Sequence, residues 1–258
     1  MKWIIQNNIY NEDGFSRLIN ALKSCNSTYS IHKIIPFSHS LSPDASDSPD
    51  GKIVIMGSST LSNISKQRGW LPGTFLNRNF SFSVQKCFWG EDMLNYDAQE
   101  CKLSYVPFQD KPFFIRPVDD GKSFAGEVMD WGSFIEWSFN VFKLDARDSP
   151  TVTADTVVMV CSKKEIYSEV RCWVINSKVV TSSEYKTGTR VIVKENTTKD
   201  VIEFAESLAR KWSPHKAFVM DIARTPKGLK IIEVNNLNSS GFYAANVEKL
   251  VLAIEKEF

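Results

Sequence analysis

Apolar residues in the first sixty positions follow two different spacings. Residues 2–6 and 29–37 predict strands, and residues 52–59 form an apolar run that is typical of a buried strand. Residues 14–25 instead carry apolar side chains three and four positions apart, the spacing of a helix with one buried face. Residues 38–51 are rich in Ser, Pro and Asp and predict a loop. Strands that alternate with a helix predict a small α/β layer around a parallel sheet.

Apolar runs in the later part of the chain are separated mostly by short polar stretches, which predicts a mainly antiparallel sheet. Residues 70–97 are aromatic and irregular and give no assignment. Helical spacing returns in residues 201–212, which Ser213-Pro214 ends, and in residues 243–258. The strands that we expect are residues 103–108, 112–118, 124–129, 156–162, 168–175, 178–185, 216–225 and 229–236.

These two patterns divide the chain. We expect an α/β domain over residues 1–105 and a mostly antiparallel domain over residues 106–258, which together give an α+β fold. A chain of 258 residues is long enough to bury a sizeable core.

The composition narrows the classes of partner. A formal net charge of +1 gives no bulk attraction to nucleic acid or to an anionic membrane. No apolar run approaches the roughly 18 residues needed to cross a bilayer, and the first residues do not look like a secretion signal. The five cysteines contain no Cys-x-x-Cys pair, which argues for reduced thiols and a cytoplasmic protein and against a disulfide framework or a zinc site. With only three histidines, histidine-based catalysis is poorly supplied.

The most informative spacing lies in residues 216–236. Pro226 suits the first central position of a type I turn, and Gly228 suits the left-handed residue that follows it. This predicts a hairpin with a three-residue loop, in which Thr225 faces Leu229.

Counting outward from that loop puts Asp221 opposite Glu233, on the same face of the sheet. Asn235, two positions further on, shares this face. Carboxylates this close repel each other unless a cation or a proton intervenes, and all-oxygen ligands of this kind suit Mg²⁺. The alternative is a polar face exposed to water. On the opposite face we expect the core residues Phe218, Met220, Ile222, Ile232 and Val234.

A second candidate cluster is basic. Residues 113–128, FFIRPVDDGKSFAGEV, place Arg116 in an apolar strand and Lys122 on a glycine-containing loop, and Arg171 lies on a later apolar strand. Arginine offers a planar donor fork that matches phosphate, and lysine offers a mobile point charge. We expect these three residues to bind phosphate oxygens that a metal on the acidic hairpin would bridge. The alternative for each is an exposed charge or a surface ion pair.

The order of these elements resembles the ATP-grasp fold. Residues 113–128 look like its first ATP-binding hairpin, with Arg116-Pro117 in place of Lys-Pro before the mobile glycine-containing loop. Residues 157–162 resemble the hinge strand that pairs with adenine through its backbone, which implies Val160 and Cys161 as adenine contacts.

The acidic hairpin looks like the metal-binding end of that fold, where an Asp and a Glu-x-Asn hold two Mg²⁺ ions. The arginine in place of lysine, followed by Lys122 and Arg171, is similar to the clade named for two arginines and one lysine, which is widespread in phages. The resemblance covers residues 106–258 well, and residues 1–100 fit the small α/β domain that usually precedes them.

The resemblance implies an ATP- and Mg²⁺-dependent enzyme that converts a carboxylate to an acyl phosphate, which an amine then attacks. It implies Arg116, Lys122 and Arg171 as catalytic residues that also contact ATP. The implied substrates are a carboxylate and an amine acceptor, either a small molecule, a peptide or a protein. Two alternatives keep the same fold: a kinase, and a nucleotide-binding module without catalysis.

The binding site for the substrate is less marked. Arg190 and Arg224 are candidates to bind a carboxylate, and Asn238, Ser239 and Tyr243 would line a pocket beyond the metal. Each of the five is equally compatible with an ordinary surface position.

Overall fold

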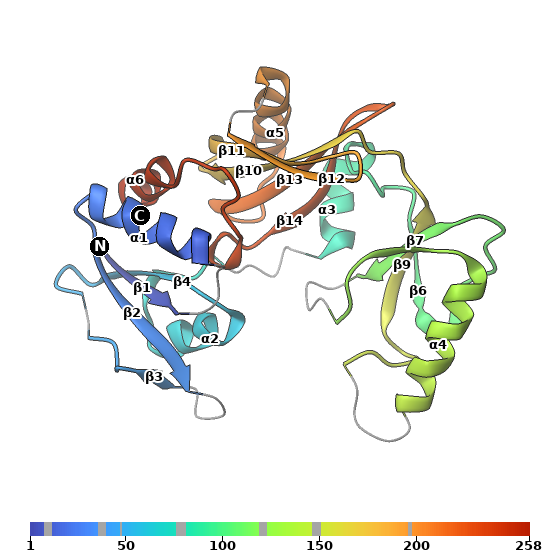
Figure 1. The fold of residues 1–258 in the computed structure, drawn as a ribbon, viewed down its shortest axis with the longest axis horizontal. Helices are drawn as coiled ribbons and strands as arrows, with labels where there is room; N and C mark the ends of the chain where they lie inside the picture. Colours follow the sequence, from blue (N-terminus) through green and yellow to red (C-terminus); the bar gives the residue numbers. More distant parts are fainter. Residues whose placement is uncertain are drawn as a thin grey trace.

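The computed structural model describes residues 1–7, 12–35, 40–46, 48–75, 81–118, 123–145, 151–195 and 198–258. These residues form three sheets, which we call the N-terminal, central and outer sheets. Figure 1 shows the N-terminal sheet in blue and cyan at one end of the molecule and the outer sheet in green and yellow at the other. The central sheet, in yellow to red, lies between them, which confirms the mixed helix-and-sheet class that we expected.

The N-terminal sheet is the predicted parallel layer. Its elements are β1 (Lys2–Gln6), α1 (Glu12–Ser24), β2 (Thr28–Ile35), β3 (Ser40–Ser42), β4 (Lys52–Met56), α2 (Ser59–Gln67) and β5 (Leu71–Gly73). The strand order is β3-β2-β1-β4-β5, and β1 pairs in parallel with both β2 and β4. Ile4, Ile5, Val54 and Ile55 are fully buried because the central parallel strands β1 and β4 are covered on both faces, which explains their apolar runs. β2 is mostly exposed or half-buried and pairs antiparallel with β3 on its outer side.

The central sheet is antiparallel throughout. Its strands are β10 (Ser168–Ile175), β11 (Lys178–Thr187), β12 (Arg190–Glu195), β13 (Ala217–Thr225) and β14 (Gly228–Asn235), in the order β12-β11-β10-β13-β14. Helix α5 (Lys199–Lys211) covers one face, where Val201, Ala205 and Leu208 pack in one cluster with Cys172 and Met220. The opposite face is therefore available for other contacts.

The outer sheet spans the boundary that we expected between residues 105 and 106. Its strands are β6 (Gln99–Lys102), β7 (Phe113–Pro117), β8 (Glu127–Met129) and β9 (Val157–Ser162), in the order β6-β9-β7-β8. Because β6 pairs with β9, residues 99–102 pack with the later part of the chain. Residues 103–108 were expected to be a strand, and this is wrong: the chain forms a 3₁₀ turn, η3 (Leu103–Tyr105), directly after β6.

Three helices were not expected from the sequence: α2, α3 and α4. Helix α3 (Phe82–Trp89) lies in the unassigned aromatic stretch, and it buries Phe82, Gln85 and Trp89. Helix α4 (Trp131–Asp145) has apolar residues on more than one face, since Phe134 is 3% exposed while Phe139 is 57% exposed. That distribution hides the helical period. Within the described residues, no helix has the length and apolar character needed to cross a membrane.

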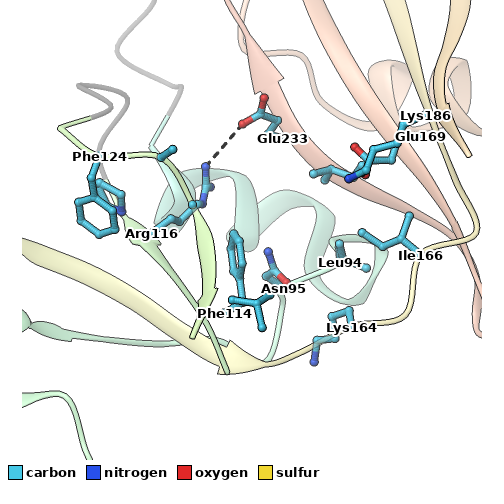
Figure 2. Close-up of a pocket in the computed structure, with 15 residues that line it drawn as sticks. Leu94, Asn95, Phe114, Arg116, Phe124, Lys164, Ile166, Glu169, Lys186 and Glu233 are labelled. Carbon is cyan, nitrogen blue, oxygen red and sulfur yellow. Dashed lines mark hydrogen bonds and ion pairs between the residues drawn. The ribbon is translucent and has the colours of Figure 1, made fainter. Parts of the chain in front are cut away.

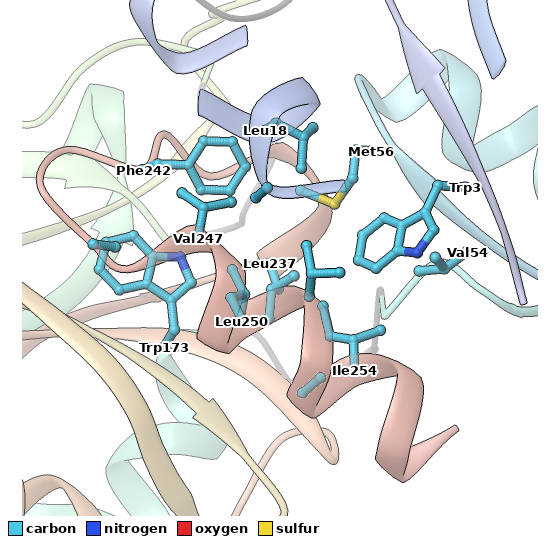
Figure 3. Packing of buried hydrophobic residues seen from close by; sticks show 14 of the residues in the cluster. Trp3, Leu18, Val54, Met56, Trp173, Leu237, Phe242, Val247, Leu250 and Ile254 are labelled. Atoms are coloured by element: carbon cyan, nitrogen blue, oxygen red, sulfur yellow. The ribbon is translucent and has the colours of Figure 1, made fainter. Parts of the chain in front are cut away.

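One apolar cluster joins the N-terminal sheet to the central sheet. Trp3 and Met56 from the N-terminal sheet pack in the same cluster as Trp173 from β10, and helix α6 (Val247–Glu257) adds Leu250 and Ile254 between them, as Figure 3 shows. Fully burying side chains of this size stabilises a fold by roughly 1.5–3 kcal/mol each. The last helix of the chain therefore fixes the first strand against the central sheet.

Asn238 makes a second connection between these two sheets. It lies in η4 (Leu237–Ser239), directly after β14, and is 0% exposed. Its Oδ1 accepts from the backbone N–H of Phe75 at 2.7 Å, and its Nδ2 donates to the carbonyl of Ile55 at 2.6 Å. Its own carbonyl accepts from the N–H of Gly57 at 2.9 Å. We call this set of hydrogen bonds the Asn238 clasp.

Replacing Asn238 with Ala should destabilise the protein strongly. The change leaves two buried backbone groups unsatisfied, at about 1–3 kcal/mol each, so we expect the free energy of unfolding to fall by about 2–6 kcal/mol. Urea unfolding followed by tryptophan fluorescence measures this loss. Ser239→Ala, at the exposed next position, is the control and should change stability by less than about 0.5 kcal/mol. Equal unfolding midpoints for the two variants would show that the clasp contributes nothing.

Candidate functional site

The turn of the acidic hairpin is shorter than the sequence suggested. Thr225 pairs with Gly228, so the loop contains only Pro226 and Lys227. The expected pairing of Thr225 with Leu229 is therefore wrong. Gly228 does have a positive φ of +93°, as its place in the turn required.

A β-bulge in β14 restores the register that brings the carboxylates together. Ile222 pairs with Ile231, but the next pair is Asp221 with Glu233, so Ile232 is the extra residue. The prediction that Asp221 faces Glu233 is thus confirmed. The bulge also exchanges two core positions: Ile231 is fully buried against α5, and Ile232, which we expected in the core, lines a cavity instead.

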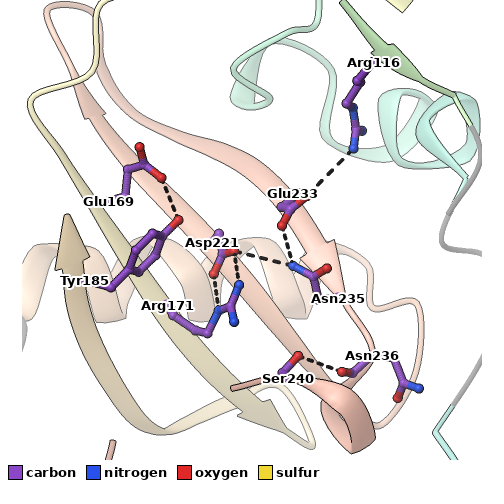
Figure 4. Close-up of polar contacts among 9 residues, drawn as sticks. All are labelled: Arg116, Glu169, Arg171, Tyr185, Asp221, Glu233, Asn235, Asn236 and Ser240. Carbon is purple, nitrogen blue, oxygen red and sulfur yellow. Dashed lines mark hydrogen bonds and ion pairs between the residues drawn. The ribbon is translucent and has the colours of Figure 1, made fainter. Parts of the chain in front are cut away.

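Asp221 is buried and bound by an arginine from the neighbouring strand. Arg171 lies directly opposite it in the β10–β13 register, and its Nε and Nη2 atoms donate to the two carboxylate oxygens at 2.8 and 2.7 Å (Figure 4). Asp221 is 1% exposed, so this pair is shielded from water. Burial opposes the charge on Arg171, but the hydrogen bonds and charge of Asp221 outweigh burial and raise the pKa of Arg171.

Two tyrosine rings lie beside the guanidinium of Arg171. Its central carbon lies 5.0 Å from the ring centre of Tyr243 and 5.7 Å from that of Tyr185. The two rings stack with centres 4.8 Å apart and planes 9° apart. Tyr243 has a φ of +46°, a backbone conformation that bulky residues rarely adopt. The rings therefore hold the guanidinium in place through cation–π contacts.

A β-bulge in β11 places Tyr185 and Lys186 on the same acid. The register shifts at this point, so that Glu169 pairs with Lys186 and Val170 with Glu184, leaving Tyr185 as the extra residue. The Tyr185 hydroxyl donates to Glu169 Oε2 at 2.7 Å, and the Lys186 ammonium donates to Glu169 Oε1 at 2.7 Å. Glu169 is thus fixed at the edge of the site with both oxygens engaged.

Asn235 connects the two carboxylates of the acidic hairpin. Its Nδ2 donates to Glu233 Oε1 at 2.7 Å and lies 3.4 Å from Asp221 Oδ2. Arg116 of β7 approaches from the outer sheet, with Nη1 3.9 Å from Glu233 Oε2. The Glu233 side chain is 29% exposed, so of the two carboxylates it is the more accessible to solvent.

This donor set fits a hard divalent cation. In the part of the chain that the structure describes, no three His, Cys, Asp or Glu side chains gather in a way that suits a metal. The oxygens of Glu233 and Asn235, with Asp221 beside them, are nevertheless the ligand type that Mg²⁺ prefers. Asp221 is buried and both of its oxygens accept from Arg171, whereas Glu233 is partly exposed and lines the open space beside it, which makes Glu233 the more accessible carboxylate.

A cavity of about 600 Å³ separates the acidic hairpin from the outer sheet (Figure 2). Its volume lies within the range of small-molecule sites. Cationic groups from three segments, Arg116, Lys164 and Lys186, line it together with the acids Glu169 and Glu233. The remaining lining residues include Leu94, Asn95, Phe114, Phe124, Val128, Ile166 and Ile232. The sequence analysis did not propose Lys164, Glu169 or Lys186. No local pattern showed that the segment between β9 and β10 lies beside the bulge in β11, at the same cavity.

The expected adenine contacts, Val160 and Cys161, are buried in β9 and do not line this cavity. Val160 is 4% exposed inside β9, between β6 and β7. Burial raises the pKa of the Cys161 thiol to about 11. The chain crosses from β9 to β10 immediately afterwards, and Lys164 and Ile166 of this crossing do line the cavity.

The other predicted residues are scattered. Arg224 binds Asp200 at the start of α5, on the helix-covered face, and this contact lowers the pKa of Asp200. Arg190 is exposed at the start of β12. Ser239 is exposed, and Asn238 forms the clasp. Of the five substrate candidates, only Tyr243 joins the cluster around Arg171. The phosphate candidate Lys122 lies outside the described residues.

Solved ATP-grasp proteins share this architecture over 91% to 100% of the chain. The ATP-grasp ligase PsnB, complexed with a minimal precursor, is 11% identical with a TM-score of 0.60, covering 100% of this chain and 99% of that chain. The D-alanine–D-alanine ligase from Bacillus anthracis is 12% identical with a TM-score of 0.63, covering 100% and 97%. A RimK-domain ATP-grasp protein from Sphaerobacter thermophilus is 10% identical with a TM-score of 0.58, covering 91% of each chain.

At these identities the likeness shows a shared fold. No curated protein sequence matches the chain. The family of ATP-grasp domains described as R2K clade family 3 matches residues 50–254, which is most of the chain. The chain therefore belongs to the ATP-grasp superfamily, in family 3 of the R2K clade.

Proposed function

We propose that this protein is an ATP- and Mg²⁺-dependent ligase that joins a carboxylate to an amine through an acyl phosphate. The proposal rests on one observation: Glu233 of the acidic hairpin and Arg116 of β7 line the same cavity and face each other there. A nucleotide triphosphate needs both: cations for its phosphates, and carboxylates for the metal that accompanies it. The solved ligases that share this fold support the reaction class.

The cavity offers different surroundings to the two ends of ATP. Phe114 and Ile232 provide apolar walls for a base, next to the crossing that contains Lys164 and Ile166. Arg116 lies toward Glu233, where phosphates and metal would meet. We assign Arg116 and Lys122 to the phosphates, because a fixed fork and a mobile ammonium together neutralise the charge that develops during transfer.

Glu233 and Asn235 would hold Mg²⁺, Asn235 through its amide oxygen. When bound there, Mg²⁺ neutralises charge on the transferred phosphoryl group. Asn235 also positions Glu233 by donating to it at 2.7 Å. The protein's contribution is thus mostly orientation and charge, and no side-chain nucleophile is required.

The reaction balances without a further reactant. A carboxylate oxygen of the substrate attacks the γ-phosphorus, the bond to the β-phosphate oxygen breaks, and ADP leaves. The amine then attacks the acyl carbon, the bond to phosphate breaks, and the amine proton leaves with phosphate or water. We place the acceptor near Tyr243, which is 36% exposed at the end of the site, with Ser239 further out. The acceptor is an amino acid, a peptide or a protein, and PsnB, which shares this fold, was solved with a precursor peptide.

Glu233→Gln should abolish turnover while leaving the fold intact. It removes the negative charge that faces the cavity but keeps the side chain's shape, so we expect ADP formation to fall by more than about a hundredfold. A coupled ADP assay measures this. The control is Glu203→Gln on α5, whose side chain is 64% exposed, and it should retain full activity. Full turnover in the Glu233 variant would end the proposal.

Arg116→Met should weaken ATP binding. Hydrogen bonds to a charged group contribute about 1.5–3 kcal/mol, so the Kd for ATP should rise by about tenfold to a hundredfold. Isothermal titration calorimetry with a non-hydrolysable analogue gives the value. Arg210→Met, at a position that is 54% exposed on α5, is the matched control. An unchanged Kd in the Arg116 variant would place the phosphates elsewhere.

Hydroxylamine separates ligation from the two alternatives. It intercepts an acyl phosphate, so candidate carboxylates supplied with ATP and hydroxylamine should give a hydroxamate together with an equal amount of ADP. A stable phosphorylated product formed without any amine identifies a kinase. A rise in melting temperature with Mg·ATP, without turnover on any acid tested, identifies a binding module. Either of the last two results contradicts the ligase assignment.

A further inference from the structure

The pairing of β10 with β13 determines the positions of Arg171 and Asp221. The two residues lie directly opposite each other on neighbouring antiparallel strands, in a stretch of the β10–β13 ladder without a register shift. Both carboxylate oxygens accept from the guanidinium, at 2.8 and 2.7 Å. Because strand pairing sets the separation, the contact does not depend on a flexible loop or on a surface side chain.

The guanidinium is also fixed from the other side. Arg171 has an exposed side-chain fraction of 11%, and the rings of Tyr185 and Tyr243 lie against it. Tyr185 is in turn held by its hydrogen bond to Glu169. Moving Arg171 toward the cavity would break two charged hydrogen bonds and leave the carboxylate of Asp221 buried without a cation, which is strongly unfavourable.

The two carboxylates of the acidic hairpin, Asp221 and Glu233, therefore have different electrostatic surroundings. Asp221 is neutralised by Arg171, behind the surface of the cavity. Among the described residues, Glu233, which lines the cavity, has an ion pair with Arg116 at 3.9 Å and a hydrogen bond from the neutral Asn235. A divalent cation bound to Asp221 would lie beside a permanently charged guanidinium that repels it. A cation bound to Glu233 and Asn235 lies farther from Arg171, and Arg116, the guanidinium next to Glu233, is 3.9 Å away, beyond hydrogen-bond distance.

We propose that the guanidinium of Arg171 takes the place of a second divalent cation, so that this protein binds nucleotide with one Mg²⁺, held by Glu233 and Asn235. This inference rests on the proposed function. It makes Arg171 a positioning residue that acts through Asp221, whereas the sequence suggested a direct contact with phosphate. It also places Asp221 outside the metal's direct ligands, with Asn235 as the link between the two parts.

Manganese serves as the probe, because bound and free Mn²⁺ are distinguished by electron paramagnetic resonance. Titration of the full chain with Mn²⁺ and a saturating non-hydrolysable ATP analogue should end at one tightly bound ion per nucleotide. Two ions of comparable affinity overturn the inference. Counting ions in the unaltered protein does not depend on any variant folding.

Replacing Arg171 tests its role directly. In Arg171→Met, Asp221 has lost its cation, and a second Mn²⁺ should appear, whereas Arg171→Lys keeps a positive charge and should stay at one. A count of one in a folded Arg171→Met variant, checked by its melting curve, overturns the inference. Because Arg171 does not contact phosphate in this arrangement, metal-free affinity for the analogue should change by less than about threefold in Arg171→Lys. A loss of tenfold or more assigns it to phosphate instead.

A comparison of two carboxylates gives an independent check. Glu233→Gln should weaken Mn²⁺ by more than about tenfold, while Asp221→Asn should weaken it less. Equal losses in the two variants make Asp221 a direct ligand and overturn the assignment. Failure of the unaltered protein to bind the analogue at all, with or without Mn²⁺, overturns the proposed function as well. Analogue bound with two ions overturns only the role given to Arg171.

Discussion

A carboxylate buried at the centre of a sheet needs a compensating cation, and much of the site follows from that need. Asp221 is 1% exposed, and its partner comes from the strand beside it. That partner is itself large and charged, so aromatic rings cover it, and one of them is anchored to Glu169. A chain of contacts thus runs from Asp221 on β13 through Arg171 and Tyr185 to Glu169, near the start of β10. Each of these side chains therefore supports the position of the next one, in addition to any part it has in the site.

The two faces of the central sheet have different roles: one packs against α5, and the other carries the candidate site. One face is filled by α5 and its apolar contacts, and the other carries the polar cluster at one end and the shared core with Trp173 at the other. Asn238 and α6 then attach the N-terminal sheet to that second face. The acidic hairpin therefore rests on two packed sheets, whereas Arg116 comes from the outer sheet across the cavity.

Local pattern was sufficient for most of the strands and for the face that Asp221 and Glu233 share, because strand periodicity and turn residues are encoded over a few positions. The Asp221–Arg171 contact was beyond that reach, since it depends on β10 lying next to β13, some fifty residues apart in the chain. Asn238 was assigned to substrate, yet its side chain binds backbone groups of β4 and of the segment after β5. A polar residue next to a site looks the same in sequence whether it binds a ligand or another strand. Helix α4 was missed because its apolar residues cover several faces.

The turn and the bulge of the acidic hairpin compensate for each other. A two-residue turn without a bulge would pair Asp221 with Ile232 and rotate Glu233 to the side covered by α5, into an apolar core. A three-residue turn with the bulge retained would pair Asp221 with Val234 and separate the carboxylates in the opposite direction. A three-residue turn without a bulge, which is the hairpin that the sequence suggested, gives the same facing pair as the one observed. Insertions and deletions in this hairpin are therefore tolerable only in matched pairs, and the length of the segment between Asp221 and Glu233 is constrained even though its tip is exposed to solvent.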